Sequence, residues 1–163
     1  MGMIGYYLRV SEQELKEIVS DSSLLDDKID SEQLDNLLDI DKSWEAIFYL
    51  LTGHPIAEEE ETNPPLSWIL FNENVVEGQD MGFGPACYLT IDQLRQLNKA
   101  LESITKEVIR QKYNGKEMNE AGVYPEVWEE PESLDYVLDY FEQLKAFLKT
   151  AETNNMAVIM FIG

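Results

Sequence analysis

Residues 4–19 read IGYYLRVSEQELKEIV, and they decide how the fold begins. Apolar and other side chains alternate over residues 4–10, which is the period of a half-buried strand. Ser11 and Glu14 then have the spacing of a capping box, in which each side chain bonds a free backbone N–H of the first helical turn. The stretch therefore predicts a strand that passes directly into a helix.

The same arrangement recurs later in the chain. Residues 85–89 are expected to form a strand, and Thr90 and Gln93 have the capping-box spacing directly after it. The helix that follows has an apolar stripe made of Leu94, Leu97, Leu101 and Ile104.

The chain ends in MAVIMFI, residues 156–162, which is apolar at both alternations. A strand of this kind is usually covered on both faces, so it should be central. We expect it to share a sheet with residues 4–10. The predicted fold class is α+β: one compact domain over residues 1–163, with a small mixed sheet that contains the N- and C-terminal strands and is packed by several helices.

The helix around Trp44 has an apolar face at the i, i+3, i+4, i+7 spacing, with Asp41 as its expected cap and Gly53 at its end. Residues 54–65, which include four consecutive glutamates, are expected to be an exposed loop. Further helices are expected over residues 31–38, 66–71, 105–113, 116–121 and 134–148.

Charge is the unusual feature of the composition. The 163 residues include 32 acidic and 12 basic side chains, a formal net charge of -20. Such a field repels nucleic-acid phosphates and anionic membranes and attracts basic proteins. We therefore expect no nucleic-acid or membrane partner, whereas a basic protein partner fits the charge. Acidity can also serve solubility alone.

The chain shows no secretory signal, and its longest apolar run, residues 156–162, is too short to cross a bilayer. Cys87 is the only cysteine, which agrees with a reducing compartment. The predicted location is cytoplasmic.

Few residues could carry out catalysis or bind a metal. His54 follows a helix end beside an acidic loop, where a histidine more often meets solvent or the helix terminus. Cys87 lies in a predicted strand and should pack as a small apolar side chain. One His and one Cys cannot make the usual zinc site. An EF-hand loop starting at Asp39 would place Trp44 where glycine is needed. We expect no metal and no cofactor.

Aromatic side chains give the best candidates for ligand binding. Tyr124 and Trp128 flank Pro125 in a predicted loop, where aromatic residues can line a pocket or an interface. With Trp44 and His54 they make up the candidate ligand-binding set.

Several phrases of the sequence resemble one bacterial family. The most specific is LDIDKSW at residues 38–44, followed by LTG at residues 51–53. The opening MGMIGY, PLS at residues 65–67, VYPEV at residues 123–127 and AVI at residues 157–159 fit as well. Together they resemble the YfbM family, whose function is unknown, over the whole chain.

The resemblance implies a stand-alone cytoplasmic α/β domain and no particular activity. It also implies one departure, because this chain has Phe48 where relatives carry a histidine in the helix between the tryptophan and LTG. Since Phe48 lies on the apolar face of that helix, we interpret the position as structural.

The lead hypothesis is a non-enzymatic binding protein that recognises another protein through its charge, for example an immunity-type antitoxin that blocks a basic toxin. The alternative is a small-molecule-binding protein or enzyme with a pocket near Trp44, His54, Tyr124 and Trp128.

Overall fold

The predicted passage from strand to helix forms in the computed structural model, which describes residues 2–31 and 34–163. β1 (Gly5–Val10) leads into α1 (Glu12–Ser20). Ser11 Oγ accepts a hydrogen bond from the Glu14 backbone N–H at 3.0 Å, and the Glu14 carboxylate accepts one from the Ser11 N–H at 2.9 Å. Thr90 and Gln93 repeat this capping box before α4 (Ile91–Leu101). Both local predictions are confirmed.

Four strands form one sheet in the order β2-β1-β4-β3. β1 pairs with β4 (Ala157–Ile162) from Gly5 opposite Ile162 to Val10 opposite Ala157, so the first and last strands are neighbours as predicted. β2 (Leu37–Asp39) and β3 (Cys87–Leu89) are the outer strands. The α+β class is confirmed, but the pairings among the described residues are all antiparallel, not mixed. The reason lies in the connections, because the chain re-enters the sheet at the end from which it left.

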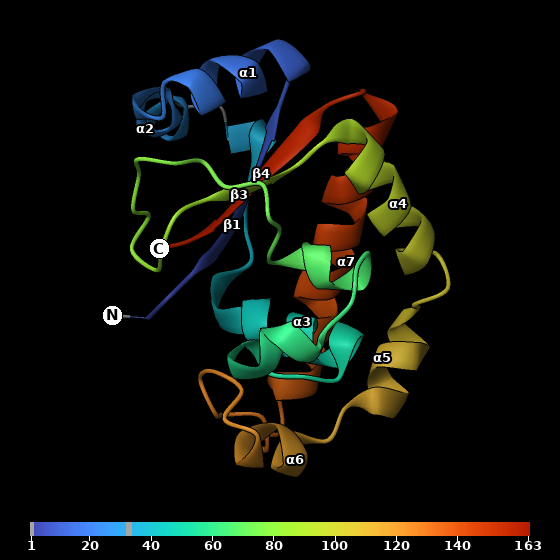
Figure 1. The fold of residues 1–163 in the computed structure, drawn as a ribbon. Helices are drawn as coiled ribbons and strands as arrows, with labels where there is room; N and C mark the ends of the chain where they lie inside the picture. Colours follow the sequence, from blue (N-terminus) through green and yellow to red (C-terminus); the bar gives the residue numbers. More distant parts are fainter. Residues whose placement is uncertain (1, 32–33) are drawn as a thin grey trace.

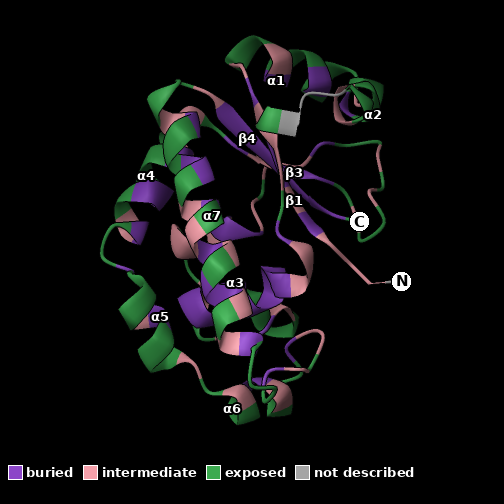
Figure 2. Ribbon diagram, turned by 180° about the vertical axis from the view of Figure 1, so that it is seen from behind, coloured by how far each residue is buried: buried purple, intermediate pink, exposed green. Residues whose placement is uncertain are grey.

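Both faces of the sheet are covered, because all six residues of β4 are buried. Val158, Met160 and Ile162 belong to the larger core cluster, together with α3 (Trp44–Thr52), α4 and α7 (Ser133–Thr153). The alternate residues of β4 belong to a smaller cluster with α1 and α2 (Ser23–Asp30). Figure 1 shows α7 and α4 beside the sheet and α1 and α2 at its upper end, and Figure 2 shows β4 buried along its length. The predicted central position of the last strand is confirmed.

The smaller helices follow the sequence closely. Thr105 caps α5 (Lys106–Lys112), and α6 (Gly115–Glu120) ends shortly before the left-handed Gly122. Gly53 ends α3 with a φ of 83°, the conformation that glycine adopts without steric cost. No helix within the described ranges is both long and apolar enough to span a membrane.

Two local predictions were wrong. Residues 31–38 were expected to be helical, but α2 ends at Asp30, and a three-residue 3₁₀ turn, η1 (Leu34–Asn36), leads into β2; residues 32 and 33 lie outside the described part. Asp41 does not cap the helix by a hydrogen bond. It has a φ of 49°, belongs to the 3₁₀ turn η2 (Asp41–Ser43), and accepts a hydrogen bond from the Tyr136 hydroxyl at 2.9 Å. In both places a tertiary contact overrides the local pattern.

The segment expected to be a loop after Gly53 contains a 3₁₀ helix, η3 (Ile56–Glu61), which carries the glutamate run. The short helix predicted after Pro65 is present as the 3₁₀ helix η4 (Leu66–Ile69). Both elements border the cavity described below.

Candidate functional site

A buried carboxylate on α3 holds two loops in place. The Glu45 residue is only 3% exposed. Its two carboxylate oxygens accept hydrogen bonds from different backbone N–H groups, Oε1 from Ile56 at 3.0 Å and Oε2 from Tyr124 at 2.8 Å. A carboxylate can be buried at acceptable cost when its oxygens are hydrogen-bonded in this way. Glu45 therefore anchors both the start of η3 and the loop that contains Tyr124.

Two of the four predicted ligand-binding residues meet at this anchor. The rings of Trp44 and Tyr124 are stacked, with centroids 5.4 Å apart. The Trp44 indole N–H donates to the Met3 carbonyl at 3.0 Å, and the Met3 N–H donates to the Tyr124 hydroxyl at 2.9 Å. Trp44 is only 1% exposed, and Tyr124 is partly buried. The pair ties the N-terminal segment to the loop after α6.

The other two predicted residues, His54 and Trp128, make their polar contacts with other partners. His54 is on the surface, with a ring nitrogen 2.9 Å from a Glu58 carboxylate oxygen. Trp128 is 1% exposed, and its indole N–H donates to the Val123 carbonyl at 2.8 Å. The structure thus brings Trp44 and Tyr124 together, whereas the polar atoms of His54 and Trp128 are engaged by other partners. A ligand-binding role for these four residues stays a prediction.

The single cysteine lies in β3 and is buried. Burial raises the pKa of the Cys87 thiol; a hydrogen bond from the Asn72 backbone opposes this shift, and the Glu59 carboxylate adds to it. A thiol with a raised pKa is mostly neutral at pH 7 and is a poor nucleophile. The packing role predicted for Cys87 agrees with this environment. Within the described ranges, no group of three or more His, Cys, Asp or Glu side chains is placed to hold a metal ion.

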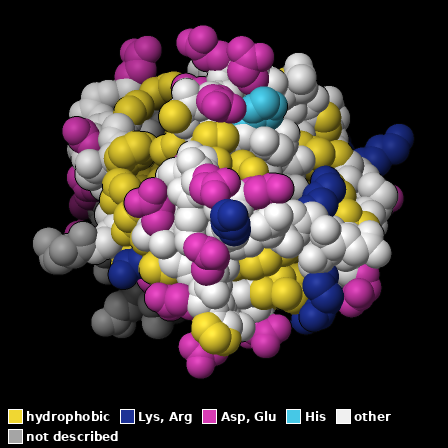
Figure 3. All heavy atoms as spheres, turned by 90° about the horizontal axis from the view of Figure 1, so that it is seen from below, with side chains coloured by type: hydrophobic (Ala, Val, Ile, Leu, Met, Phe, Trp, Pro, Cys, Tyr) yellow, Lys and Arg dark blue, Asp and Glu magenta, His cyan; other side chains and the backbone are white. Residues whose placement is uncertain are grey.

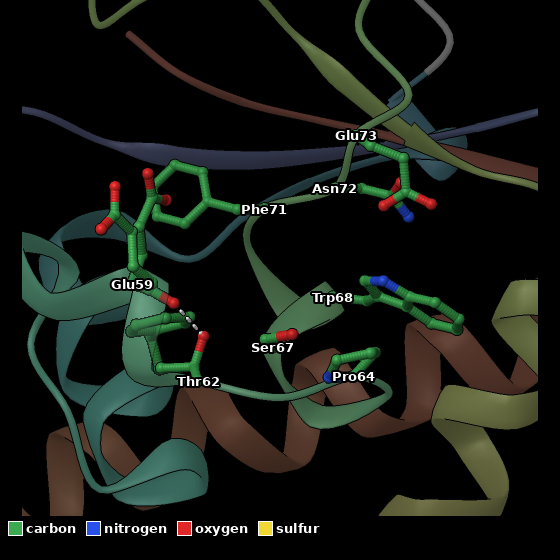
Figure 4. Close-up of a pocket in the computed structure, with 10 residues that line it drawn as sticks. Glu59, Thr62, Pro64, Ser67, Trp68, Phe71, Asn72 and Glu73 are labelled. Atoms are coloured by element: carbon green, nitrogen blue, oxygen red, sulfur yellow. Dashed lines mark hydrogen bonds between the residues drawn. The ribbon is translucent and has the colours of Figure 1, made fainter.

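A surface cavity of about 410 Å³ lies between η3 and η4 (Figure 4). Its volume is in the range of small-ligand sites. Its wall combines carboxylates, aromatic rings and short polar side chains: Phe48, Glu59, Glu60, Thr62, Pro64, Ser67, Trp68, Phe71, Asn72 and Glu73. We call this the η3–η4 cavity.

Packing from beneath fixes the wall of the η3–η4 cavity. Phe71 contacts Phe48 of α3 edge to face, with ring centroids 5.8 Å apart, and Phe48 is fully buried. The Thr62 hydroxyl donates to the Glu59 carbonyl at 2.5 Å, which closes the end of η3. The Trp68 N–H donates to the Pro65 carbonyl at 3.1 Å within η4. The aromatic rings are therefore mounted on short, locally bonded turns.

Phe48 is the position where the family resemblance implied a departure. The structure places its ring at the base of the η3–η4 cavity, fully buried against Phe71. The interpretation of this position as structural agrees with that packing.

The cavity carboxylates face solvent. Glu59, Glu60 and Glu73 are all exposed, and within the described ranges none of them makes an ion pair. Figure 3 shows acidic side chains, with the histidine among them, at one edge of a face that also exposes hydrophobic side chains. Carboxylates beside aromatic rings attract cations, the carboxylates by charge and the rings by their negative faces.

One polar atom near this wall lacks a partner. The Asn72 side-chain oxygen accepts a hydrogen bond from the Asn74 N–H at 3.0 Å, which leaves the amide nitrogen as the donor. That nitrogen is buried and has no hydrogen-bond partner in the part of the chain that is described. An unsatisfied buried donor costs roughly 1–3 kcal/mol.

Sequence reasoning missed both this cavity and Glu45. The sequence predicted an exposed loop for the glutamate run and a short helix for the segment that contains Trp68 and Phe71. The sequence feature that could have indicated the cavity is a cluster of turn and aromatic residues after Pro64 and Pro65. For Glu45 it was a lone carboxylate in an otherwise apolar helix.

Comparison with known proteins agrees with the resemblance noted in the sequence. The family described as "Domain of unknown function (DUF1877)" matches residues 1–161. Protein YfbM of Escherichia coli (strain K12) is 29% identical over 171 residues, and the match covers all of both chains. The crystal structure of YfbM, described as a protein of unknown function from Escherichia coli, superposes with a TM-score of 0.74 at 22% identity, covering 98% of this chain and 99% of that one. At that identity the superposition shows a shared fold.

Proposed function

Because this chain belongs to the DUF1877 family of domains of unknown function, we propose a function from its geometry: it is a binding protein that recognises a basic segment of another protein in the η3–η4 cavity. The observation that carries the proposal is the composition of that cavity. Three exposed carboxylates without an ion pair among the described residues surround the same space as Trp68 and Phe71.

The charge of the whole molecule supports a basic partner. A net charge of -20 attracts a positively charged protein as it approaches to within about a Debye length, about 8 Å at physiological salt. This attraction increases the rate of encounter, while contacts in the cavity decide which segment stays bound. The global charge and the local cavity thus favour the same class of partner.

A protein segment suits the cavity better than a bare ion does. Thr62 and Ser67 carry hydroxyl groups on the wall, which can bond to the backbone of a bound segment. Trp68 and Phe71 can cover the aliphatic stem of a lysine or arginine while its charged head meets a carboxylate. A single ion would leave these apolar surfaces unused.

The test is calorimetric titration with an arginine-containing peptide and a peptide of the same length in which glutamine replaces arginine. We expect only the basic peptide to bind, and its affinity to fall as salt is raised from 50 to 300 mM because exposed ion pairs are screened. The combined change Glu59→Gln, Glu60→Gln and Glu73→Gln should weaken binding about tenfold, since exposed ion pairs contribute about 0.2–1 kcal/mol each and a total loss of about 1.4 kcal/mol is a factor of ten.

The matched control carries Glu117→Gln, Glu130→Gln and Glu132→Gln, which removes the same charge from exposed positions outside the cavity wall. Its affinity should stay within about twofold of the unchanged chain, because distant exposed charges are screened. Equal losses in the two variants would show that binding is diffuse attraction to an acidic surface, and the proposed site would be wrong.

A further inference from the structure

The η3–η4 cavity has two ends of similar chemistry. In Figure 4, Phe71 lies with Glu59 at one end, Trp68 lies with Glu73 at the other, and Ser67 lies between them. Each end therefore offers one aromatic ring and at least one carboxylate. This is the combination that holds a single ammonium or guanidinium group.

The spacing of the two ends is set by the fold. Phe71 and Trp68 both belong to the chain turn around η4, where the Phe71 N–H donates to the Ser67 carbonyl at 3.3 Å. Phe71 is also supported by Phe48 of α3. Because both rings are mounted on one hydrogen-bonded turn, a ligand that contacts both must match a fixed separation.

The end at Trp68 and Glu73 has one further feature. The Asn72 amide nitrogen is adjacent in the chain to Glu73 and has no partner among the described residues. The nitrogen is buried in the unbound chain, so a ligand can reach it only if neighbouring atoms move. A backbone carbonyl of a bound segment would then satisfy this donor.

From these observations we infer that the recognised segment is dibasic: it carries two basic side chains, one for each end of the cavity, at a fixed separation along the segment. This inference rests on the proposed function and adds the number and spacing of the charges that the partner presents. A segment with one basic residue can occupy either end but never both.

The experiment compares peptides that contain two arginines separated by zero to four glycines with a peptide that contains one arginine. All dibasic peptides carry the same charge, so diffuse attraction to the acidic surface predicts the same affinity for each. We expect the peptide with one particular separation between its arginines to bind at least fivefold more tightly than the other dibasic peptides in calorimetric titration. That optimum should be lost in both Glu59→Gln and Glu73→Gln.

The peptide with one arginine is the internal control. Because it can use either end, Glu59→Gln or Glu73→Gln alone should weaken it by no more than about twofold, whereas each change should weaken the best dibasic peptide at least threefold. Circular dichroism of both variants checks that they fold.

The outcomes separate the two proposals. Equal affinity at every separation overturns the dibasic inference and leaves recognition of a basic segment standing. Absence of binding by any arginine peptide overturns both. Free spermidine that displaces the best peptide with equal affinity shows that the two ends serve a small polyamine, and the inference of a protein segment is then wrong.

Discussion

Glu45 and Glu59 lie 14 residues apart in the chain and have opposite environments. Glu45 is buried and both of its oxygens accept backbone hydrogen bonds, whereas Glu59 is exposed and its carboxylate makes no ion pair among the described residues. A carboxylate whose oxygens are already used by the backbone stabilises the fold, while one that faces solvent keeps its charge available for a ligand. In this acidic chain, local environment distinguishes a carboxylate that holds the fold from the carboxylates that we propose to bind a ligand, whereas residue type does not.

Removing the buried carboxylate of Glu45 should cause the largest loss of stability. Glu45→Ala leaves the N–H groups of Ile56 and Tyr124 without their acceptors in a water-poor site. Since a hydrogen bond to a charged group contributes about 1.5–3 kcal/mol, we expect the free energy of unfolding to fall by about 3–5 kcal/mol. Urea denaturation followed by tryptophan fluorescence measures this change.

Glu45→Gln keeps the shape and one carbonyl acceptor, so it should lose about half as much stability. It also keeps the experiment informative if the alanine variant fails to fold. If the free energy of unfolding falls by less than about 0.5 kcal/mol in Glu45→Gln, the two backbone hydrogen bonds do not depend on a carboxylate. Glu45 would then not differ from Glu59 in stabilising the fold.

A smaller loss of stability is expected when the hydroxyl of Tyr124, whose backbone N–H bonds to Glu45, is removed. Tyr124→Phe keeps the stacking on Trp44 but removes the hydroxyl that accepts from the Met3 N–H at 2.9 Å. We expect a loss of about 1 kcal/mol in the free energy of unfolding, the usual contribution of one neutral hydrogen bond. Tyr88→Phe is the control, because its hydroxyl makes no hydrogen bond among the described residues. A loss as large as that of Glu45→Ala would show that the side chain of Tyr124, not its backbone contact with Glu45, holds the loop.

Local patterns predicted the parts of the fold that depend on near neighbours. The capping boxes at Ser11 and Thr90 form because their partners lie three residues away. The central strand β4 was recognisable because all of its residues are apolar. In contrast, β2 has three residues, and it is a strand because it pairs with Tyr6–Leu8 of β1. No pattern within the segment itself records that pairing.

The candidate site was less predictable for the same reason. Glutamates 58–61 were expected to be exposed, and the exposure of Glu59 and Glu60 agrees. That Glu73 shares a cavity with them depends on how η4 turns back beside η3. The role of Glu45 depends on two backbone N–H groups, one of them 79 residues away. Contacts over such separations are products of the fold and leave no short motif.

The smallest effect on stability is expected at the cavity itself. Glu59, Glu60 and Glu73 are exposed, so the triple glutamine variant should change the free energy of unfolding by less than about 0.5 kcal/mol, as exposed substitutions usually do. The direction should be towards greater stability, because removing three negative charges from a chain of net charge -20 relieves repulsion, and this gain should shrink as salt rises. The urea transitions of this variant and of Glu45→Ala, measured at two salt concentrations, make the comparison direct. A loss of stability above 1 kcal/mol in the triple variant would show that these carboxylates maintain the fold as Glu45 does. Their lack of ion pairs would then no longer argue for a ligand.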